Sequence, residues 1–333
     1  AVVQAAEPLE LGSAPERTRP EKVCFQFTSE QEEIAAAHRH AIRFSDRNLP
    51  RRSRKKGQKF TGCRPDGEHH TLADVREGRC NVFHLTADMD EESLRQLVCG
   101  FGALPSAVPG AAGASAELER YGIPALQIAA GAQGLLLERE IADEETGEII
   151  RRQLPTAFPA PSLLACSFDV DVIRSVGRAV GLEMAEYGLQ LWYGPSANVM
   201  RTPLEKDFSE KWSEDPVVCG ICAAALAGGV WPYGAAILHA GALPDTVSVP
   251  QAALRDVYAL PFEIAAGASR AAKLPACAIG GQQLHEDSPL LRAWLLDCGY
   301  TGMLYGGAGP EDRLQLEKAA LRILRLILQL KRA

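Results

Sequence analysis

The feature that most constrains the fold is a regular alternation of short apolar runs and longer helical segments from residue 125 onward. The runs predicted to be strands are Ala125–Ala129, Leu189–Tyr193, Ala235–His239, Ala276–Gly280 and Met303–Tyr305. The segments predicted to be helices are Val170–Tyr187, Pro216–Gly228, Gln251–Ala266, Ser288–Cys298 and a closing helix over 311–331. Strands that alternate with helices at this spacing predict an α/β fold with a parallel sheet.

Residues 1–70 differ from the rest because they are polar and carry a basic run, Arg51–Lys59. Within them, Lys22–Thr28 alternates like a strand and Ser29–His40 reads as a helix. The basic run is typical either of a patch that docks an acidic partner or of a solvated linker. We favour a partly ordered connector, because few aromatic residues interrupt the basic run and the net charge of the chain is −7. We therefore predict a connector over 1–70 and a second domain over 71–333.

Cysteine usage and charge limit the cellular setting. The nine cysteines are dispersed and odd in number, which predicts reduced thiols and a cytoplasmic protein. Cys219 and Cys222 form a C-x-x-C spacing inside an alanine-rich helical run, where packing is favoured over redox or metal chemistry. The acidic balance argues against a nucleic-acid partner, and the lack of a long apolar run argues against a membrane partner.

The ends of the predicted strands are where a parallel β/α barrel places its chemistry. Here those ends are mostly apolar residues or glycine, namely Ala130–Gly134, Gly194–Arg201, Leu238 with His239, and Gly306 with Gly307. A working barrel normally gathers titratable groups at this rim, so the scarcity of such groups is informative.

Several segments of the chain resemble glycoside hydrolase family 3. They are Tyr121–Leu135, Pro155–Asp169, Leu189–Leu204, Phe208–Pro216 and Ala253–Glu263, in the family's order. The pairing of N-x-x-R-x-P-L with a following S-E-D-P is the most specific part of the match, which runs from about residue 71 to 309. The resemblance implies a TIM-barrel-like (β/α) barrel and a retaining β-glucosidase-like activity, which needs two carboxyl groups about 5 Å apart.

The family's functional positions are largely vacated in this chain. The place of the nucleophilic Asp falls on Gly307, so the resemblance implies that no catalytic residue remains. Of the sugar-binding positions, Ala130 replaces an Asp, Asp207 replaces an Arg and Leu238 replaces a Lys. The resemblance leaves His239 and Arg201 as residual substrate-binding residues, although each also has a plain structural reading, in a buried hydrogen bond or an ion pair.

Other polar clusters have structural alternatives. Glu210, Glu214 and Asp215 form a carboxylate cluster that could supply an acid/base pair, but acids at this place are typical of a helix N-terminus. The turn His285–Asp287 lacks a second ligand pair, so we predict no metal site and no cofactor. Trp192, Trp212 and Trp231 are suited either to stacking on a sugar or to packing.

The segment that follows the nucleophile in the family looks deleted, so we expect an incomplete barrel or one with fewer than eight strands. An open barrel edge would need cover from a partner chain or from a second copy in a homo-oligomer. We predict a pseudoenzyme that binds carbohydrate or acts in assembly. The alternative is an active β-glycosidase whose catalytic residues are relocated or supplied by a partner.

Overall fold

The computed structural model describes residues 62–63, 66–138, 140–143, 146–205, 208–239, 253–269, 271–273, 278–279, 282–283, 300, 302–305 and 312–330. The elements predicted at Lys22–Thr28, Ser29–His40 and Ser288–Cys298, and the basic run Arg51–Lys59, lie outside these residues. The predicted division of the chain at residues 70 and 71 therefore stays a prediction.

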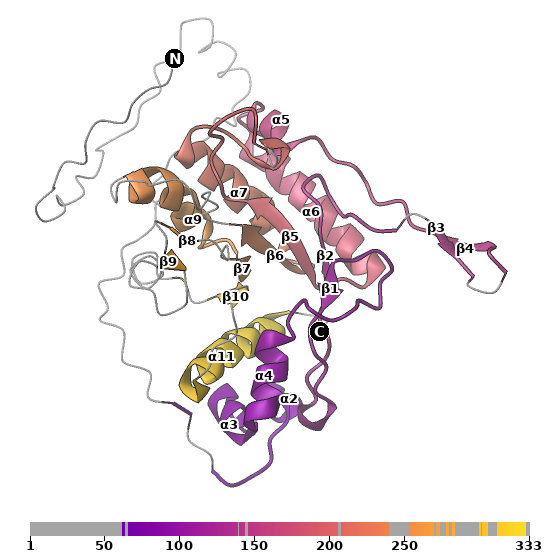
Figure 1. Ribbon diagram of the computed structural model, residues 1–333, viewed down its shortest axis with the longest axis vertical. Helices are drawn as coiled ribbons and strands as arrows, with labels where there is room; N and C mark the ends of the chain where they lie inside the picture. The colour runs from indigo at the N-terminus through magenta and orange to yellow at the C-terminus, as the bar shows by residue number, and fades with distance from the viewer. Residues whose placement is uncertain are drawn as a thin grey trace, which may run out of the picture.

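A mixed sheet of six strands lies at the centre of the described structure, in the order β1-β2-β5-β6-β7-β10 (Figure 1). The strands are β1 (Gly113–Ala114), β2 (Gln127–Ala129), β5 (Leu191–Ser196), β6 (Ala235–His239), β7 (Ala271–Lys273) and β10 (Met303–Tyr305). Strand β1 is antiparallel to β2, and all the other neighbours are parallel. The parallel part follows the chain order, as the successive strands of a β/α barrel do.

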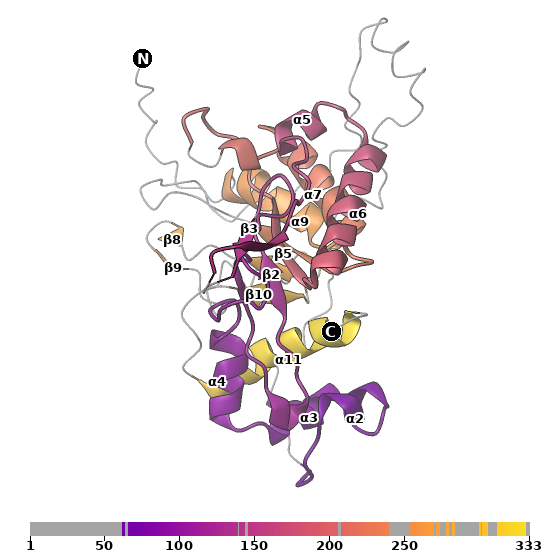
Figure 2. The ribbon, with the colours of Figure 1, turned by 90° about the vertical axis from the view of Figure 1, so that its right-hand side faces the viewer.

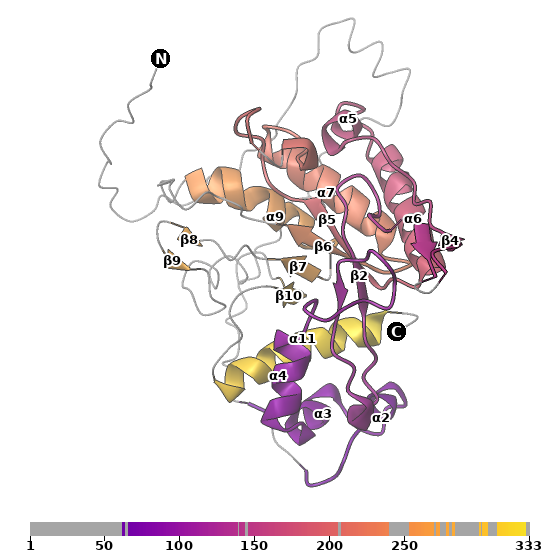
Figure 3. The same ribbon diagram turned by 45° about the vertical axis from the view of Figure 1, so that its right-hand side comes forward.

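One face of the sheet is covered by the helices that connect its strands (Figure 3). These are α5 (Pro161–Ala165), α6 (Val170–Tyr187), α7 (Pro216–Val230) and α9 (Leu260–Ala265), the last preceded by a π-helical segment, η3 (Leu254–Ala259). Helix α7 contacts both α6 and α9 and is buried on almost all sides. The outer core contains Ala129, Trp192 and Leu238 from the sheet, together with apolar side chains of these helices.

The opposite face of the sheet is covered by helices from both ends of the described chain (Figures 1 and 2). They are α2 (Leu72–Arg76), α3 (Val82–Asp88), α4 (Glu91–Cys99) and α11 (Arg313–Gln329). Alternate strand residues, Leu191, Ile237 and Met303, join the inner core that these helices complete. In a closed barrel this face would point to the interior, so α11 and its neighbours occupy the inner side of an open barrel.

Capping residues set the ends of several helices. Asp215 begins α7 by accepting hydrogen bonds from the backbone N–H groups of Val217 and Val218, at 2.7 and 3.0 Å. Thr71 and Asp74 form a capping box that starts α2. Helix α6 ends at Gly188, which has a left-handed conformation with φ of 75°.

Most of the predicted elements are present with small changes in their bounds. The predicted helix over Gln251–Ala266 is split between η3 and α9 in the described part of that range. The predicted strand Ala276–Gly280 is wrong as a member of the central sheet. That place is taken by β7, while β8 (Ala278–Ile279) pairs with β9 (Gln282–Gln283) in a separate hairpin. Both segments are short and apolar, so the sequence pattern did not separate them.

A second hairpin was not predicted. Strands β3 (Glu140–Ala142) and β4 (Ile149–Arg152) pair with each other alone among the described strands and project from the body (Figure 1). The remaining short elements are the 3-10 helices η1 (Glu119–Tyr121) and η2 (Phe208–Glu210). Within the described ranges, no helix combines the length and the hydropathy that a membrane span requires.

The fold prediction is confirmed: the chain forms a TIM-barrel-like arrangement that is partial. Among the described strands, β1 and β10 are the two ends of the sheet order and do not pair with each other. Helix α11 contacts β10 and so lies beside that end of the sheet. A partner chain or second copy at an open edge stays a prediction.

Candidate functional site

The carboxyl ends of the parallel strands form one row of polar positions. The backbone register pairs Ser196 with His239, His239 with Lys273, and Lys273 with Tyr305. His239 follows Ile237 by two residues, so both lie on the inner face of the sheet. The register therefore brings Ser196, His239, Lys273 and Tyr305 to a single line across the strand ends, which we call the strand-end row.

The two residues predicted to contact substrate, His239 and Arg201, have aromatic neighbours. The imidazole of His239 is half-buried and lies edge-on to the ring of Tyr193, with 5.1 Å between ring centroids. The guanidinium of Arg201 is exposed and lies 5.8 Å from the centre of the Tyr258 ring. A cation over an aromatic face is favourable electrostatically, and this contact joins the loop after β5 to η3. The substrate-binding role of both residues stays a prediction.

The turn after β2 keeps its backbone shape although Ala130 provides no carboxylate. Gly131 and Gly134 have φ of +134° and +111°. A Cβ at Gly131 would lie 2.1 Å from the carbonyl oxygen of Gly134, so a side chain is excluded there. The carbonyl of Gly131 accepts a hydrogen bond of 2.9 Å from Nε1 of Trp192. The turn is thus fixed by glycine and by the indole.

Two tryptophans that could have stacked on a sugar are instead core residues. Trp192 and Trp212 are 1% and 2% exposed, and the indole of Trp212 donates a 2.9 Å hydrogen bond to the carbonyl of Ser196. Both line a small cavity of about 10 Å³ behind the glycine turn, room for about one water molecule. Leu238, at the vacated Lys position, is fully buried in the outer core.

The acidic cluster before α7 is structural where its contacts are described. Asp215 caps the helix, as the sequence predicted, and Glu214 is exposed. Nearby, the buried ammonium of Lys211 forms an ion pair with Glu205. Asp207 and Gly307, the vacated Arg position and the place of the nucleophile, lie outside the described residues.

The C-x-x-C pair packs inside α7, as the sequence predicted. Cys219 and Cys222 are both fully buried in the outer core. Burial raises the pKa of each thiol to about 12, so both are protonated at neutral pH. The Sγ atom of Cys219 donates to the carbonyl of Ser213 at 3.0 Å. These thiols are therefore poor nucleophiles and poor metal ligands.

Sequence reasoning missed half of the strand-end row. Lys273 lies outside the predicted strand Ala276–Gly280, and Tyr305 is predicted only as part of a short strand. The signal that could have found Lys273 is the apolar pair before it, Ala271 and Ala272, which is shorter than a usual strand pattern.

The chemistry available at this row follows from its residue types. Ser196 and His239, whose side chains the structure describes, provide a hydroxyl and an imidazole, and both groups hydrogen-bond well to polyols. None of the strand-end residues that the structure describes, from Ala129 to Tyr305, is a carboxylate. Retaining glycoside hydrolysis needs two carboxyl groups about 5–5.5 Å apart, and the described strand ends do not provide them.

Comparison with known proteins supports the TIM-barrel-like fold described above. Residues 140–295 match the family described as "Glycosyl hydrolase family 3 N terminal domain". The chain is 34% identical over 163 residues to thermostable β-glucosidase B of Acetivibrio thermocellus, which covers 46% of this chain and 21% of that protein. It is 27% identical over 251 residues to β-glucosidase A of Butyrivibrio fibrisolvens, covering 72% of this chain and 29% of that protein.

Solved structures give the same fold. β-Glucosidase 3B from Thermotoga neapolitana, in complex with α-D-glucose, superposes with a TM-score of 0.65 at 24% identity, over 73% of this chain and 42% of that one. A β-glucosidase from Paenibacillus barengoltzii gives a TM-score of 0.67 at 22% identity, over 92% and 37%. This chain thus spans a fifth to two fifths of the length of these relatives. Residues 140–295 are thus similar to the N-terminal domain of glycosyl hydrolase family 3, and the fold is that of the solved β-glucosidases.

Proposed function

We propose that this domain binds carbohydrate at the strand-end row without hydrolysing glycosides itself. The observation that carries the proposal is the residue set at the described strand ends, which has hydrogen-bonding side chains at Ser196 and His239 but has Ala130 where the family carries a sugar-binding Asp. The resemblance also puts Gly307 at the place of the nucleophile. Loss of a nucleophile alone removes several orders of magnitude of rate.

The class of ligand follows from the relatives. A solved relative is described in complex with α-D-glucose, and the curated relatives are β-glucosidases. A glucose-sized sugar presents several hydroxyl groups, which suit the hydroxyl of Ser196 and the imidazole of His239. We propose a monosaccharide or the end of a β-linked glucoside as the ligand.

The first test is turnover of aryl β-glycosides, with an active β-glucosidase of this family as the positive control. We expect no release of the aryl group by the wild-type chain. Turnover that disappears in His239→Ala and in Arg201→Ala, but persists when the exposed Gln329 at the end of α11 is changed in Gln329→Ala, would establish the alternative of an active β-glycosidase.

The second test is calorimetric titration with glucose and cellobiose. We expect saturable binding by the wild type. We expect His239→Ala to raise the Kd by roughly two- to tenfold, because one lost hydrogen bond costs about 0.5–1.5 kcal/mol. The Gln329→Ala variant should bind like the wild type. Absence of binding by a folded wild-type chain would reject the carbohydrate site while leaving the similarity to the family intact.

A further inference from the structure

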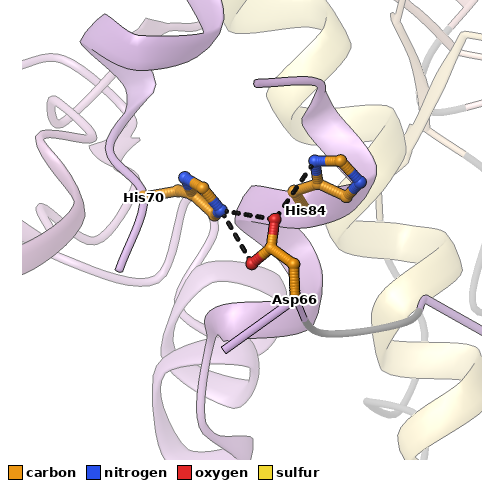
Figure 4. Close-up of side chains that lie close together, drawn as sticks. All are labelled: Asp66, His70 and His84. Carbon is orange, nitrogen blue, oxygen red and sulfur yellow. Dashed lines mark hydrogen bonds and ion pairs between the residues drawn. The ribbon is translucent and has the colours of Figure 1, made fainter. Parts of the chain in front are cut away.

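Three side chains converge in the N-terminal part of the described chain, away from the strand-end row in sequence. Asp66, His70 and His84 each direct a ligand atom to the same point, and these atoms all lie within 4.8 Å of one another (Figure 4). Asp66 and His70 lie on the segment before α2, and His84 lies in the first turn of α3. We call these residues the Asp66 cluster.

The distances in the cluster are close to those around a bound metal ion. Nε2 of His70 lies 2.9 Å from both carboxylate oxygens of Asp66, and Nδ1 of His84 lies 3.5 Å from Oδ2 of Asp66. Tetrahedral ligands at about 2.0–2.1 Å from zinc are about 3.3 Å apart. The distances from Asp66 to the two histidines therefore differ from the ligand separations of a tetrahedral zinc site by only a few tenths of an ångström.

The backbone around the cluster is held in place by bonds that do not involve its ligand atoms. Asp88, at the end of α3, accepts from the backbone N–H of His70 at 3.0 Å and contacts the ring of His69 at 2.8 Å. The side chain of Asn81 caps α3 and accepts from the N–H of His84 at 3.0 Å. Both sides of the cluster are thus anchored to α3, which lowers the entropic cost of gathering the ligands.

We propose that Asp66, His70 and His84 bind a divalent transition-metal ion, with Zn²⁺ the best match. Two imidazoles with one carboxylate are a donor set that zinc uses with nitrogen and oxygen ligands, and water completes the fourth position. His70 is 7% exposed, whereas the side chains of Asp66 and His84 are 37% and 40% exposed, so a water ligand can reach the ion from the side of these two residues. Carboxylates alone suit magnesium or calcium, whereas two imidazoles favour a transition metal.

The ion would join the chain before α2 to α3, which contacts α11 on the inner side of the sheet. The site therefore has a structural role in this proposal: it fixes the entry of the chain onto the inner helical layer. The competing explanation is that Asp66 contacts His70 and His84 directly, by hydrogen bonds or ion pairs, and that no metal is bound. That explanation predicts no stoichiometric binding.

The test is metal binding by the full chain after removal of metal with a chelator and dialysis. Zn²⁺ is titrated in competition with a chromophoric chelator, and Co²⁺ is titrated for its visible absorption bands. We expect one tight site per chain, a Co²⁺ spectrum without a thiolate charge-transfer band, and a higher Tm with one equivalent of Zn²⁺. His84→Ala and Asp66→Asn should each weaken the binding by about a hundredfold or more, since even outer-shell changes cost 10–100-fold.

His69→Ala is the matched control, because His69 is the neighbour of His70 but contacts Asp88 and the carbonyl of Arg120 instead of the cluster. It should keep the tight site. The side chain of His84 is 40% exposed, so His84→Ala should fold, and His84→Asn provides a second variant if it does not. Binding that is unchanged in the folded cluster variants, or that disappears on thiol alkylation, would overturn the proposal.

Discussion

Asp215 shows how a single acidic side chain can suggest catalysis in a sequence and serve the fold in the structure. Its carboxylate accepts hydrogen bonds from two backbone N–H groups at the start of α7. These N–H groups have no partner within the helix, because they belong to its first turn. The neighbouring Glu214 is exposed. The sequence allowed this distinction because an acid directly before a Pro-initiated helix is a typical N-cap.

We expect Asp215→Ala to lower the free energy of unfolding by about 1 kcal/mol, since the cap is lost. The matched change Glu214→Ala should stay within about 0.5 kcal/mol of the wild type. Urea denaturation followed by circular dichroism measures both. Equal effects of the two substitutions would show that the capping contact contributes nothing of its own.

Residues that are close in space but distant in the sequence were harder to predict than residues that are close in the sequence. The members of the strand-end row come from four strands, and Lys273 was missed because β7 has only three residues. The Asp66 cluster was missed for a related reason. Its two histidines are separated by a helix and a turn, a spacing that matches no common ligand motif.

The contact between α6 and α7 depends on glycines at the points where the two helices approach most closely. A Cβ at Gly177 would lie 2.2 Å from the carbonyl oxygen of Leu226, and a Cβ at Gly229 would lie 2.2 Å from that of Arg174. The obstacles are backbone atoms, which cannot rotate away as a flexible side chain could. Glycine at these positions is therefore a packing requirement, although it lowers intrinsic helix propensity.

Gly177→Ala should destabilise the protein by about 1–3 kcal/mol, because α6 must move away from α7. Gly228→Ala is the matched control in α7: no atom lies within 4 Å of the added Cβ, so the better helix propensity should stabilise by up to about 1 kcal/mol. Differential scanning calorimetry of both variants checks the opposite signs. Stabilisation by both substitutions would mean that the helices are not held this close in solution.

Much of the secondary structure was predictable because the hydrophobic periodicity and the helix caps indicate the same bounds. Helix α6 and strands β6 and β10 have the predicted bounds. The hairpin of β3 and β4 was not foreseen, since charged residues interrupt the alternation of its strands. Strand β7 and hairpin β8–β9 could not be told apart by pattern alone, because only the pairing in the sheet decides which short apolar run is central.

On the scale of the whole molecule, the arrangement of two helical layers around one sheet explains how a partial barrel can be stable. A closed barrel buries its inner face by bringing strands round to meet one another. Here the inner face is covered by α11 and by α3 and α4, which arrive from opposite ends of the described chain. The sequence predicted that part of the barrel is missing. It did not predict that a helix covers the inner face, because the apolar stripe of α11 can pack against either face of a sheet.

This arrangement makes α11 essential for stability. Leu324 is fully buried in the inner core with Ile237 and Met303, whereas Gln329 lies exposed at the end of the same helix. We expect Leu324→Ala to cost about 2–5 kcal/mol of unfolding free energy, since it removes buried contacts and leaves a cavity against the sheet. Gln329→Ala should be nearly neutral, and thermal unfolding of both variants gives the comparison. If Leu324→Ala were also neutral, α11 would not cover the sheet in solution, and the inner face would need the partner chain or second copy predicted for an open edge.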